Sequence, residues 1–285
     1  MIIVQIKGGL GNQLFSLASA YGIAKENNTN VIIDKYIYDT SYKLREYMLK
    51  NFPGISNELL IGYNPKNNTI SQKFYKILRK MKLRYQYKCQ LINESEEFKY
   101  QEIISEKNLY LNGYWQNYMY FDKYREEIVD KFKPLIKPTD SYTQLAAEIS
   151  ANNSVAVHIR RGDYVHFKGG KCLEITYYFE AMNVIRNQDS KSTFYIFADD
   201  LNYCKEAFDS IENVVIISER GNFSDLEEFD LMIKCNNFII GNSTFSWWAA
   251  YLSKNKNKVV IAPVVDMWKK EFYLPEWRTI DASLE

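Results

Sequence analysis

Val155-Ala-Val-His-Ile159 is a short apolar run that opens a regular alternation of strand and helix patterns. Short, unbroken apolar strands that alternate with helices are typical of a parallel sheet covered on both faces. We therefore expect a doubly wound α/β domain in this half of the chain. The predicted strands are 155–159, 193–198, 214–217, 238–240 and 259–262, and the predicted helices are 176–186, 202–208, 225–235 and 244–252.

The amino-terminal part of the chain begins with the same alternation. Residues 2–6 form an apolar run rich in β-branched residues, a glycine-containing turn follows, and residues 14–25 have the apolar spacing of a helix. With a second predicted strand at 31–33, this order is strand–helix–strand, which indicates another parallel sheet. Further along, we predict a strand at 109–114 and a helix at 118–132.

A boundary between two domains is predicted in the middle of the chain. Pro134 and Pro138 interrupt the helical pattern, and a polar stretch at 152–154 precedes the next strand. This gives an amino-terminal lobe of residues 1–150 and a carboxyl-terminal lobe of residues 151–285. The expected fold class is α/β, with two doubly wound, Rossmann-type lobes that face a cleft.

The composition excludes several classes of protein. The chain has 285 residues and a formal net charge of +1, so no strong positive field indicates nucleic acid as a partner. Its four cysteines are far apart and it has two histidines, so we expect no metal, no cofactor, and reduced thiols in the cytoplasm. The sequence has no run of about 18 apolar residues to span a membrane, and its first apolar run is too short for a signal peptide.

Two adjacent arginines follow the first strand of the carboxyl-terminal lobe, in Val155-Ala-Val-His-Ile-Arg-Arg-Gly-Asp-Tyr164. His158, Arg160 and Arg161 are thus predicted near the carboxyl end of a buried strand, where two guanidiniums are costly unless they are paired. An incoming pyrophosphate would pair them, because arginine forms bidentate bonds with phosphate oxygens. A structural network of arginine and Asp163 is the alternative.

A second cluster lies at a predicted helix start, in Phe238-Ile-Ile-Gly-Asn-Ser-Thr-Phe-Ser-Trp-Trp-Ala-Ala250. Ser243 and Thr244 can cap the first turn and leave backbone N–H groups pointing outward, which makes an anion site. Simple capping is the alternative. We expect Trp247 and Trp248 to be core residues.

Two carboxylates, Asp199 and Asp200, follow the predicted strand 193–198 at the same sheet edge as the arginines. A carboxylate there does not suit phosphate, but it can accept hydrogen bonds from N1–H and the amino group of guanine. Capping of the helix at 202–208 is the alternative, and one aspartate can serve each purpose.

The first turn, Gly8-Gly-Leu-Gly-Asn-Gln13, has the glycines of a dinucleotide-binding loop except the third, because Leu14 occupies that position. An NAD-dependent oxidoreductase is therefore a weak alternative. Asn12 and Gln13 would supply amide hydrogen bonds to a sugar or a phosphate as the helix starts.

These segments together resemble the bacterial α-1,2-fucosyltransferases, which are related to the enzymes that make the H blood-group antigen. The matching pieces are Gly8-Gly-Leu-Gly-Asn-Gln-Leu-Phe15, Gly113-Tyr-Trp-Gln116, His158-Ile-Arg-Arg-Gly-Asp-Tyr164, Phe197-Ala-Asp-Asp200 and Asn242-Ser-Thr-Phe-Ser-Trp-Trp248. They span nearly the whole chain in the family's order. The resemblance implies a two-lobed GT-B fold, in which residues 1–150 form the acceptor-side lobe and residues 151–285 the GDP-fucose-binding lobe. It also implies GDP-β-L-fucose as donor, inverting transfer to the 2-hydroxyl of a galactose-containing acceptor glycan, and no metal.

The resemblance also implies roles for single residues. Arg160 and His158 contact the diphosphate. The resemblance identifies no general base. We take Asp163 as the candidate from its place in the sequence, although two neighbouring arginines make it a poor proton acceptor. The leaving phosphate is the alternative acceptor of the proton. The donor-binding candidates are Asn12, Arg161, Asp199, Asp200, Ser243, Thr244 and Phe245, and the acceptor-side candidates are Tyr114, Trp115 and Gln116.

Several alternatives concern linkage, activity and location. A fucosyltransferase of another linkage, such as α-1,6 or α-1,3, is the main competitor, and a non-catalytic sugar-binding module is the competitor outside the enzymes. Residues 70–88 carry seven Lys or Arg, no acid, and one apolar helical stripe. Such a helix can lie on the inner face of an anionic membrane and bring the enzyme to lipid-linked acceptors, whereas packing on its own lobe is the alternative.

Overall fold

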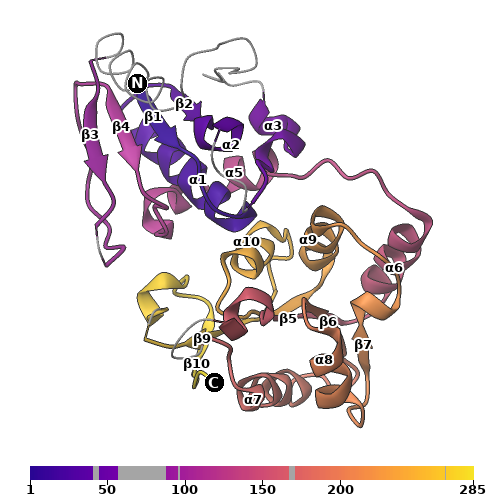
Figure 1. Ribbon diagram of the computed structural model, residues 1–285. Coiled ribbons are helices and arrows are strands. Elements are labelled where there is room, and N and C mark those ends of the chain that lie inside the picture. Colours follow the sequence, from indigo (N-terminus) through magenta and orange to yellow (C-terminus); the bar gives the residue numbers. More distant parts are fainter. Residues whose placement is uncertain (41–44, 57–87, 96, 167–170, 267) are drawn as a thin grey trace. The chain divides into compact units, whose positions relative to one another are not determined.

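The computed structural model describes residues 1–40, 45–56, 88–95, 97–166, 171–266 and 268–285. The chain divides into two units, Met1–Lys133 and Pro134–Glu285. Each is built on a parallel sheet with helices, so the expected α/β class is confirmed (Figure 1). The division falls earlier than residue 150, because helix α6 (Asp140–Ala151) packs on α9 (Asp225–Lys234) and so belongs to the second unit.

The amino-terminal unit has, among its described residues, a four-stranded parallel sheet with the order β2-β1-β4-β3. Helix α1 (Leu10–Glu26) connects β1 to β2 and buries most of its length. It begins earlier than expected, with Gly9 as its N-cap, so Asn12 and Gln13 lie in its first turn. The strands are β1 (Ile2–Gln5), β2 (Val31–Asp34), β3 (Gln90–Asn93) and β4 (Leu109–Asn112).

Short helices complete this unit, and one of them differs from the prediction. The expected helix at 118–132 is wrong in its first half, where two 3₁₀ turns precede a shorter α-helix. The side chain of Asn117 accepts a hydrogen bond from the backbone N–H of Met119 (2.9 Å), which favours a tight turn over a continuous helix. The helices are α2 (Tyr36–Thr40), η1 (Leu49–Asn51), α3 (Pro53–Ser56), η3 (Tyr118–Tyr120), η4 (Asp122–Tyr124) and α5 (Arg125–Lys131).

The carboxyl-terminal unit has a six-stranded parallel sheet, as far as the chain is described, with the order β10-β9-β8-β5-β6-β7. Its last strand, β10, was not predicted. It pairs with β9 from Arg278↔Ile261 to Asp281↔Val264, so the predicted strand at 259–262 is not the final one. The strands are β5 (Ser154–Ile159), β6 (Thr193–Ala198), β7 (Val214–Ile216), β8 (Asn237–Ile239), β9 (Val260–Val264) and β10 (Arg278–Asp281).

Helices cover both faces of this sheet (Figure 1). Because side chains alternate along a strand, Val155 and Val157 of β5 pack in the core beneath α7 and α8, whereas His158 faces α10. Trp247 and Trp248 of α10 are fully buried, as expected. The remaining helices are α7 (Ile175–Arg186), α8 (Leu201–Phe208) and α10 (Thr244–Leu252), with the 3₁₀ turns η5 (Gly162–His166), η6 (Ile217–Glu219) and η7 (Lys270–Phe272).

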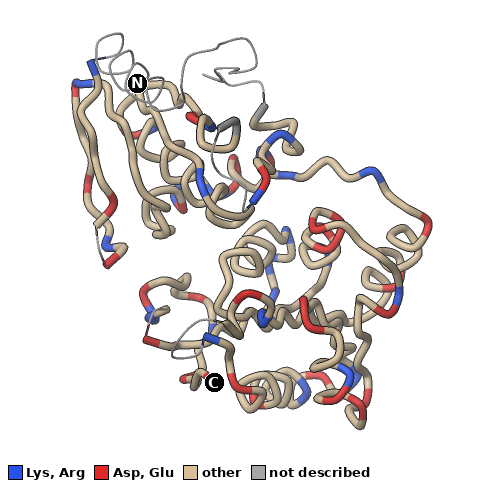
Figure 2. Tube along the Cα trace, in the orientation of Figure 1, with Lys and Arg blue, Asp and Glu red and all other residues tan. Residues whose placement is uncertain are grey.

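Charged residues of both signs are interspersed along the described parts of both units (Figure 2). This pattern agrees with the near-neutral net charge and lacks the single-sign field of a nucleic-acid-binding surface. Among the described residues, none of the helices combines the length and the apolar composition that crossing a membrane requires. The predicted basic helix at 70–88 lies, except for Lys88, outside the described residues.

Candidate functional site

Arg160 lies just past the carboxyl end of β5, and two carboxylates hold its guanidinium. It pairs with Asp163 and with Asp199, whose Oδ2 is 2.5 Å from Nη1. The ring of Tyr164 lies 5.6 Å from the guanidinium carbon. The arginine side chain remains 24% exposed, so it can still offer N–H groups to a ligand.

Asp199 organises the loop that carries both arginines. Its Oδ1 accepts the backbone N–H groups of Arg161 (2.8 Å) and Gly162 (3.0 Å). A Cβ atom on Gly162 would lie 2.6 Å from Asp199 Oδ2, so glycine permits this close approach. The structural network of arginine and aspartate that the sequence left open as an alternative is therefore present, and Asp199 is committed to it.

Arg161 has surroundings different from those of Arg160. Its guanidinium carbon lies 3.7 Å from the centre of the Tyr203 ring, it pairs with Glu285, and its Nε is 3.4 Å from Asp200 Oδ2. Its side chain is 16% exposed. Stacking and two carboxylates occupy this arginine, so it contributes to the structure of the loop more than to a ligand surface.

His158 is the next-to-last residue of β5, and it is buried, with 8% of its surface exposed. Burial lowers its pKa to about 4, and the positive charge of Arg160 acts in the same direction against the opposing effect of Asp199. The imidazole is therefore neutral at pH 7. Its ring lies 5.8 Å from that of Phe245, and a Cβ atom on Gly241 would approach the His158 carbonyl to 2.8 Å. These contacts bring the ends of β5 and β8 against the start of α10.

The start of α10 is capped as the sequence indicated. Ser243 is the N-cap, and its Oγ accepts the N–H of Phe245 (3.3 Å). Asn242 is buried, with its Nδ2 donating to the carbonyl of Lys171 (2.8 Å), and its own carbonyl accepts from the Tyr164 hydroxyl (3.3 Å). The loop after β5 is thus tied to a helix N-terminus, which favours anions.

Helix α9 brings a carboxyl group to this region that the sequence did not indicate. Burial raises the pKa of Glu228 to about 7, with further contributions from the negative charges of Asp225 and Asp199. Its carboxyl group has no hydrogen-bond partner in the described part of the chain. By contrast, Asp200 caps α8 by accepting the N–H of Tyr203 (3.1 Å). A half-buried carboxyl group with a strongly raised pKa is typical of a functional site. In the sequence, Glu228 belongs to an ordinary helical pattern and to no motif, so nothing there distinguished it from a surface residue.

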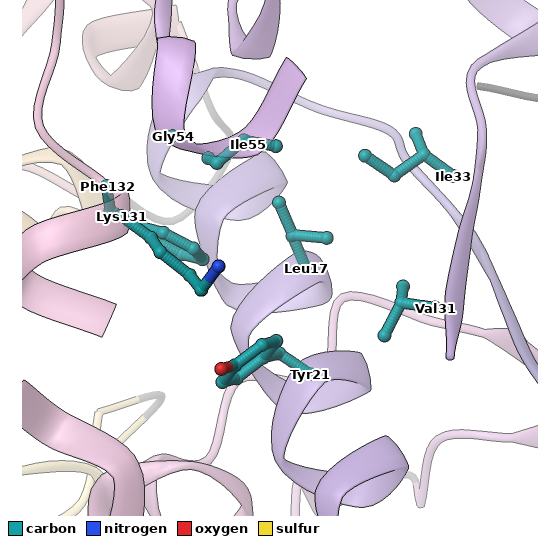
Figure 3. A pocket seen from close by; sticks show the side chains of 8 residues that line it. All are labelled: Leu17, Tyr21, Val31, Ile33, Gly54, Ile55, Lys131 and Phe132. Carbon is teal, nitrogen blue, oxygen red and sulfur yellow. The ribbon is translucent and has the colours of Figure 1, made fainter. Parts of the chain in front are cut away.

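Two cavities differ in what they can hold. A small cavity of about 20 Å³ in the amino-terminal unit is mostly apolar, and its lining includes Leu17 and Tyr21 of α1 and Val31 and Ile33 of β2 (Figure 3). A nucleotide needs hundreds of cubic ångströms, so this cavity is a packing gap. The second, of about 460 Å³, lies at the carboxyl ends of β5 and β6. It is lined by Gly162, Val165, His166, Asp199, Asp200, Leu201 and Asn202.

The sequence candidates of the amino-terminal unit meet at the carboxyl edge of its own sheet. Gln116 Nε2 donates to Asn12 Oδ1 (2.7 Å), and the ring of Tyr114 lies 4.7 Å from Lys7 Nζ. Trp115 differs from the expectation, because it is 2% exposed and packs edge-on against Tyr120 at 5.4 Å. A ring buried in this way anchors the turn and is not a surface on which a sugar can stack.

Metal ligands are not grouped in the described residues. No set of three or more His, Cys, Asp or Glu side chains there is arranged to hold a metal ion.

Polar residues at the carboxyl ends of parallel strands, beside a capped helix N-terminus, are typical of α/β enzymes that bind a nucleotide at that edge. Residues 1–281 match the model of Glycosyl transferase family 11. The chain belongs to this family and is a glycosyltransferase.

Similar proteins include transferases of two deoxy sugars. An α-1,2-colitosyltransferase of Escherichia coli is 31% identical over 279 residues, which cover 92% of this chain and 91% of the relative. Galactoside α-(1,2)-fucosyltransferase 2 of Hylobates lar is 26% identical, covering 97% of this chain and 78% of the relative. Among solved structures, the fucosyltransferase NodZ from Bradyrhizobium is 15% identical with a TM-score of 0.49, covering 87% of this chain and 92% of that one.

Proposed function

We propose that this glycosyltransferase moves L-fucose from GDP-β-L-fucose to the 2-hydroxyl of a terminal β-galactoside, with inversion to an α-1,2 linkage. The observation that carries the proposal is Arg160, a partly exposed guanidinium that two carboxylates hold. Its loop is tied to the start of α10 through Tyr164, whose ring contacts Arg160 and whose hydroxyl donates to the carbonyl of Asn242. This pair of cationic elements suits a diphosphate leaving group. The α-1,2 linkage is supported by the names of the Escherichia coli and Hylobates lar relatives.

The reaction breaks the bond between the anomeric carbon and the β-phosphate oxygen, and the electron pair leaves with GDP. Arg160 and the first N–H groups of α10 stabilise the developing negative charge, and neutral His158 is a hydrogen-bonding group beside them. The anomeric carbon passes through an oxocarbenium-like state while the acceptor oxygen attacks from the opposite face. Because Asp163 pairs with Arg160, it serves to hold the arginine. The acceptor's hydroxyl proton is lost to water on the attacking face as the new C–O bond forms, while the electron pair of the broken bond leaves with GDP.

The guanine-reading carboxylate in this proposal is Glu228. Asp199 is occupied by the arginine loop and Asp200 caps α8, whereas Glu228 has no partner in the described chain. Phe229, the next residue of α9, packs against Phe245 at the start of α10 with ring centroids 5.0 Å apart, so α9 borders the same region, and the charge of Asp199 contributes to the raised pKa of Glu228. Its ionised form can accept from N1–H and the amino group of guanine.

The proposal also requires no metal, because Arg160 supplies the positive charge that a divalent cation would otherwise provide. Activity is expected to survive excess EDTA. Loss of activity on chelation, with recovery on adding Mg²⁺ or Mn²⁺, would show that the acidic residues after β6 bind a metal.

The deciding experiment is incubation with lactose and a panel of nucleotide sugars, with the product linkage determined by NMR. GDP-fucose is expected to yield fucose on the galactose 2-hydroxyl. GDP-colitose belongs in the panel, because the 31% identical relative is a colitosyltransferase and colitose is the second candidate donor sugar. Transfer from UDP-galactose but not from either GDP sugar would reject the donor assignment. Fucose on the 3-hydroxyl of glucose would reject only the linkage.

A further inference from the structure

The turn that follows β4 has an uncommon backbone. Gly113 has φ +154° and Trp115 has φ +56°, and the second value is costly for a residue with a large side chain. Such a conformation persists only where the surrounding structure holds it. The turn lies at the carboxyl edge of the sheet, where parallel α/β units bind ligands.

Glu94, the first residue after β3, holds this turn with its carboxylate. Oε2 accepts the backbone N–H of Tyr114 (2.6 Å), and Oε1 accepts that of Gln116 (2.8 Å). The Glu94 backbone N–H donates to the carbonyl of Asn112 (3.0 Å), which fixes its own position. A Cβ atom on Gly113 would lie 2.4 Å from Glu94 Cβ, so only glycine permits the contact.

Helix α1 holds the same turn from the other side. Ser16 Oγ shares its proton between the carbonyls of Asn12 (3.0 Å) and Tyr114 (3.2 Å), and Ser19 Oγ donates to the carbonyl of Trp115 (2.9 Å). With Trp115 buried, Tyr114 and Gln116 are the partly exposed members of the turn. The side-chain bond from Gln116 to Asn12 adds an amide group to the same edge.

We propose that Glu94 is a positioning residue of the acceptor subsite, and that it presents the Tyr114 ring and the Gln116 amide to the acceptor sugar. The inference rests on the proposed function, since it takes the acceptor to be a neutral galactoside. A ring face and an amide suit such a sugar, because they supply an apolar surface and hydrogen bonds without a net charge.

Protonation of Glu94 should weaken the subsite. A protonated carboxyl group loses acceptor capacity at one oxygen, so one backbone N–H of the turn would lose its partner. Burial raises the pKa of Glu94, which the N–H bonds of the turn and the charge of Lys7 oppose. Among the described groups, Tyr120 also lies near enough to interact, because the charge of Glu94 contributes to the raised pKa of Tyr120. The KM for the acceptor should therefore rise as the pH falls, whereas the pH dependence of the donor KM arises in the other unit and should be the same in a Glu94 variant.

The test is Glu94→Gln, which keeps the shape but replaces one accepting oxygen by an amide nitrogen. The KM for lactose is expected to rise about tenfold or more, the KM for GDP-fucose to stay within about twofold, and the acid-dependent rise in acceptor KM to disappear. Glu94→Asp, which keeps both accepting oxygens on a shorter side chain, should recover part of the acceptor affinity.

Asn27→Ala is the matched control in the same unit. Asn27 also clamps backbone, donating to the carbonyl of Ile103 (2.7 Å) and accepting from the N–H of Ser105 (2.8 Å), but it precedes β2 and lies at the opposite end of the sheet. This variant should lower Tm and leave the lactose KM unchanged. A wild-type lactose KM in Glu94→Gln, or an equal rise in both variants, would overturn the inference.

Failure of the proposed function gives a separate result. In that case the wild-type enzyme would transfer no fucose to lactose, whatever residue 94 is. Saturation-transfer NMR with lactose and GDP then tests the subsite without turnover. Lactose signals that weaken in Glu94→Gln but not in Asn27→Ala support the inference, and absence of lactose binding to the wild type overturns it.

Discussion

The carboxyl edges of the two sheets carry opposite arrangements of charge. In the carboxyl-terminal unit a guanidinium, that of Arg160, lies beyond β5, and carboxylates hold it. In the amino-terminal unit a carboxylate, that of Glu94, lies beyond β3, and backbone N–H groups hold it. Both edges are built by side chains that come from distant parts of the chain.

The difference indicates what each edge can bind. At the first edge a partly exposed guanidinium lies in a loop that is hydrogen-bonded to the start of a helix, which suits a diphosphate. At the second the carboxylate is used inside the protein, and a ring and an amide remain for the ligand, which suits an uncharged sugar. The predictions below test this contrast from the largest expected effect to the smallest.

The largest effect is expected from Arg160→Lys. Lysine keeps the charge but loses the planar fork that binds two phosphate oxygens. The transition state should lose about 2–4 kcal/mol of stabilisation, as when an oxyanion donor is removed. The value of kcat/KM for GDP-fucose should therefore fall roughly 30- to 900-fold. Steady-state kinetics with varied donor measure the change.

Arg186→Lys is the control for this substitution. Arg186 lies at the end of α7, donates to the carbonyl of Glu212 (3.1 Å), and stacks on Phe194 at 4.9 Å. It should lose some stability and retain the wild-type kcat/KM. A folded Arg160→Lys enzyme with wild-type turnover would contradict the role of the first edge.

The next effect is expected from Glu228→Gln, read as GDP affinity against pH. Guanine binds the ionised carboxylate, so wild-type affinity should strengthen as the pH rises through about 7, the pKa of Glu228 in the unliganded protein. The variant should bind GDP about 1.5–3 kcal/mol more weakly at alkaline pH and show a flat profile in this range. Isothermal titration calorimetry with GDP and ADP measures both affinity and base discrimination.

Asp225→Asn sharpens the same test. Removing this negative charge should move the wild-type profile to lower pH, because Asp225 contributes to the raised pKa of Glu228. The stability of the unliganded protein should depend on pH in the opposite direction to its affinity for GDP. The raised pKa stabilises the unliganded protein below about pH 4.5, and this contribution is lost as the pH rises through about 7. If GDP affinity depends on pH identically in the wild type and in Glu228→Gln, Glu228 does not bind guanine, and Asp199 or Asp200 becomes the candidate again.

The sequence predicted the elements that have a strong apolar pattern. Strand β6 and helix α10 have the predicted bounds, Thr193–Ala198 and Thr244–Leu252. Strand β3 is mostly exposed and short, so it has no apolar run to reveal it, and β10 is likewise a half-exposed edge strand. The sequence indicated the break at Pro134 and Pro138 but not the helix α6 that follows it. The boundary was therefore expected after residue 150, whereas the second unit begins at Pro134.

The site was predictable where one motif supplies its residues and not where distant segments meet. Arg160 and Ser243 stand at a strand exit and a helix start that are visible in the sequence. Glu228 and Glu94 have no local signal, because each acquires its surroundings from segments far along the chain. Backbone N–H groups bind Asp199, which no side-chain pattern reveals, and this contact is why the proposal assigns guanine to Glu228 and not to Asp199.

A smaller effect is expected from Arg161→Lys, this time on stability. The substitution removes stacking on Tyr203 and the planar pairing with Glu285 and Asp200. The free energy of unfolding should fall by about 1–2 kcal/mol, since the arginine is largely desolvated. Thermal and urea denaturation measure it, with Lys205→Gln as a control, because its exposed pair with Glu219 should contribute less than about 1 kcal/mol. Lost turnover with unchanged stability would instead assign Arg161 to the ligand surface of the first edge.

The smallest effect is expected from Val31→Ile, which adds one methylene group beside the apolar cavity of the amino-terminal unit (Figure 3). Val31 is the first residue of β2, so it lies at the amino end of the sheet, opposite the edge that holds Glu94. Filling the gap should stabilise the protein by about 0.5 kcal/mol, below the roughly 0.8 kcal/mol of a fully buried methylene, because Val31 is only half-buried. Urea denaturation should show a higher midpoint with the same slope, and KM for both substrates should remain at the wild-type values. A lower midpoint would mean that the surrounding side chains cannot accommodate the extra group. A changed lactose KM would mean that the two ends of this sheet are coupled, and the acceptor subsite could then no longer be treated as a property of the Glu94 turn alone.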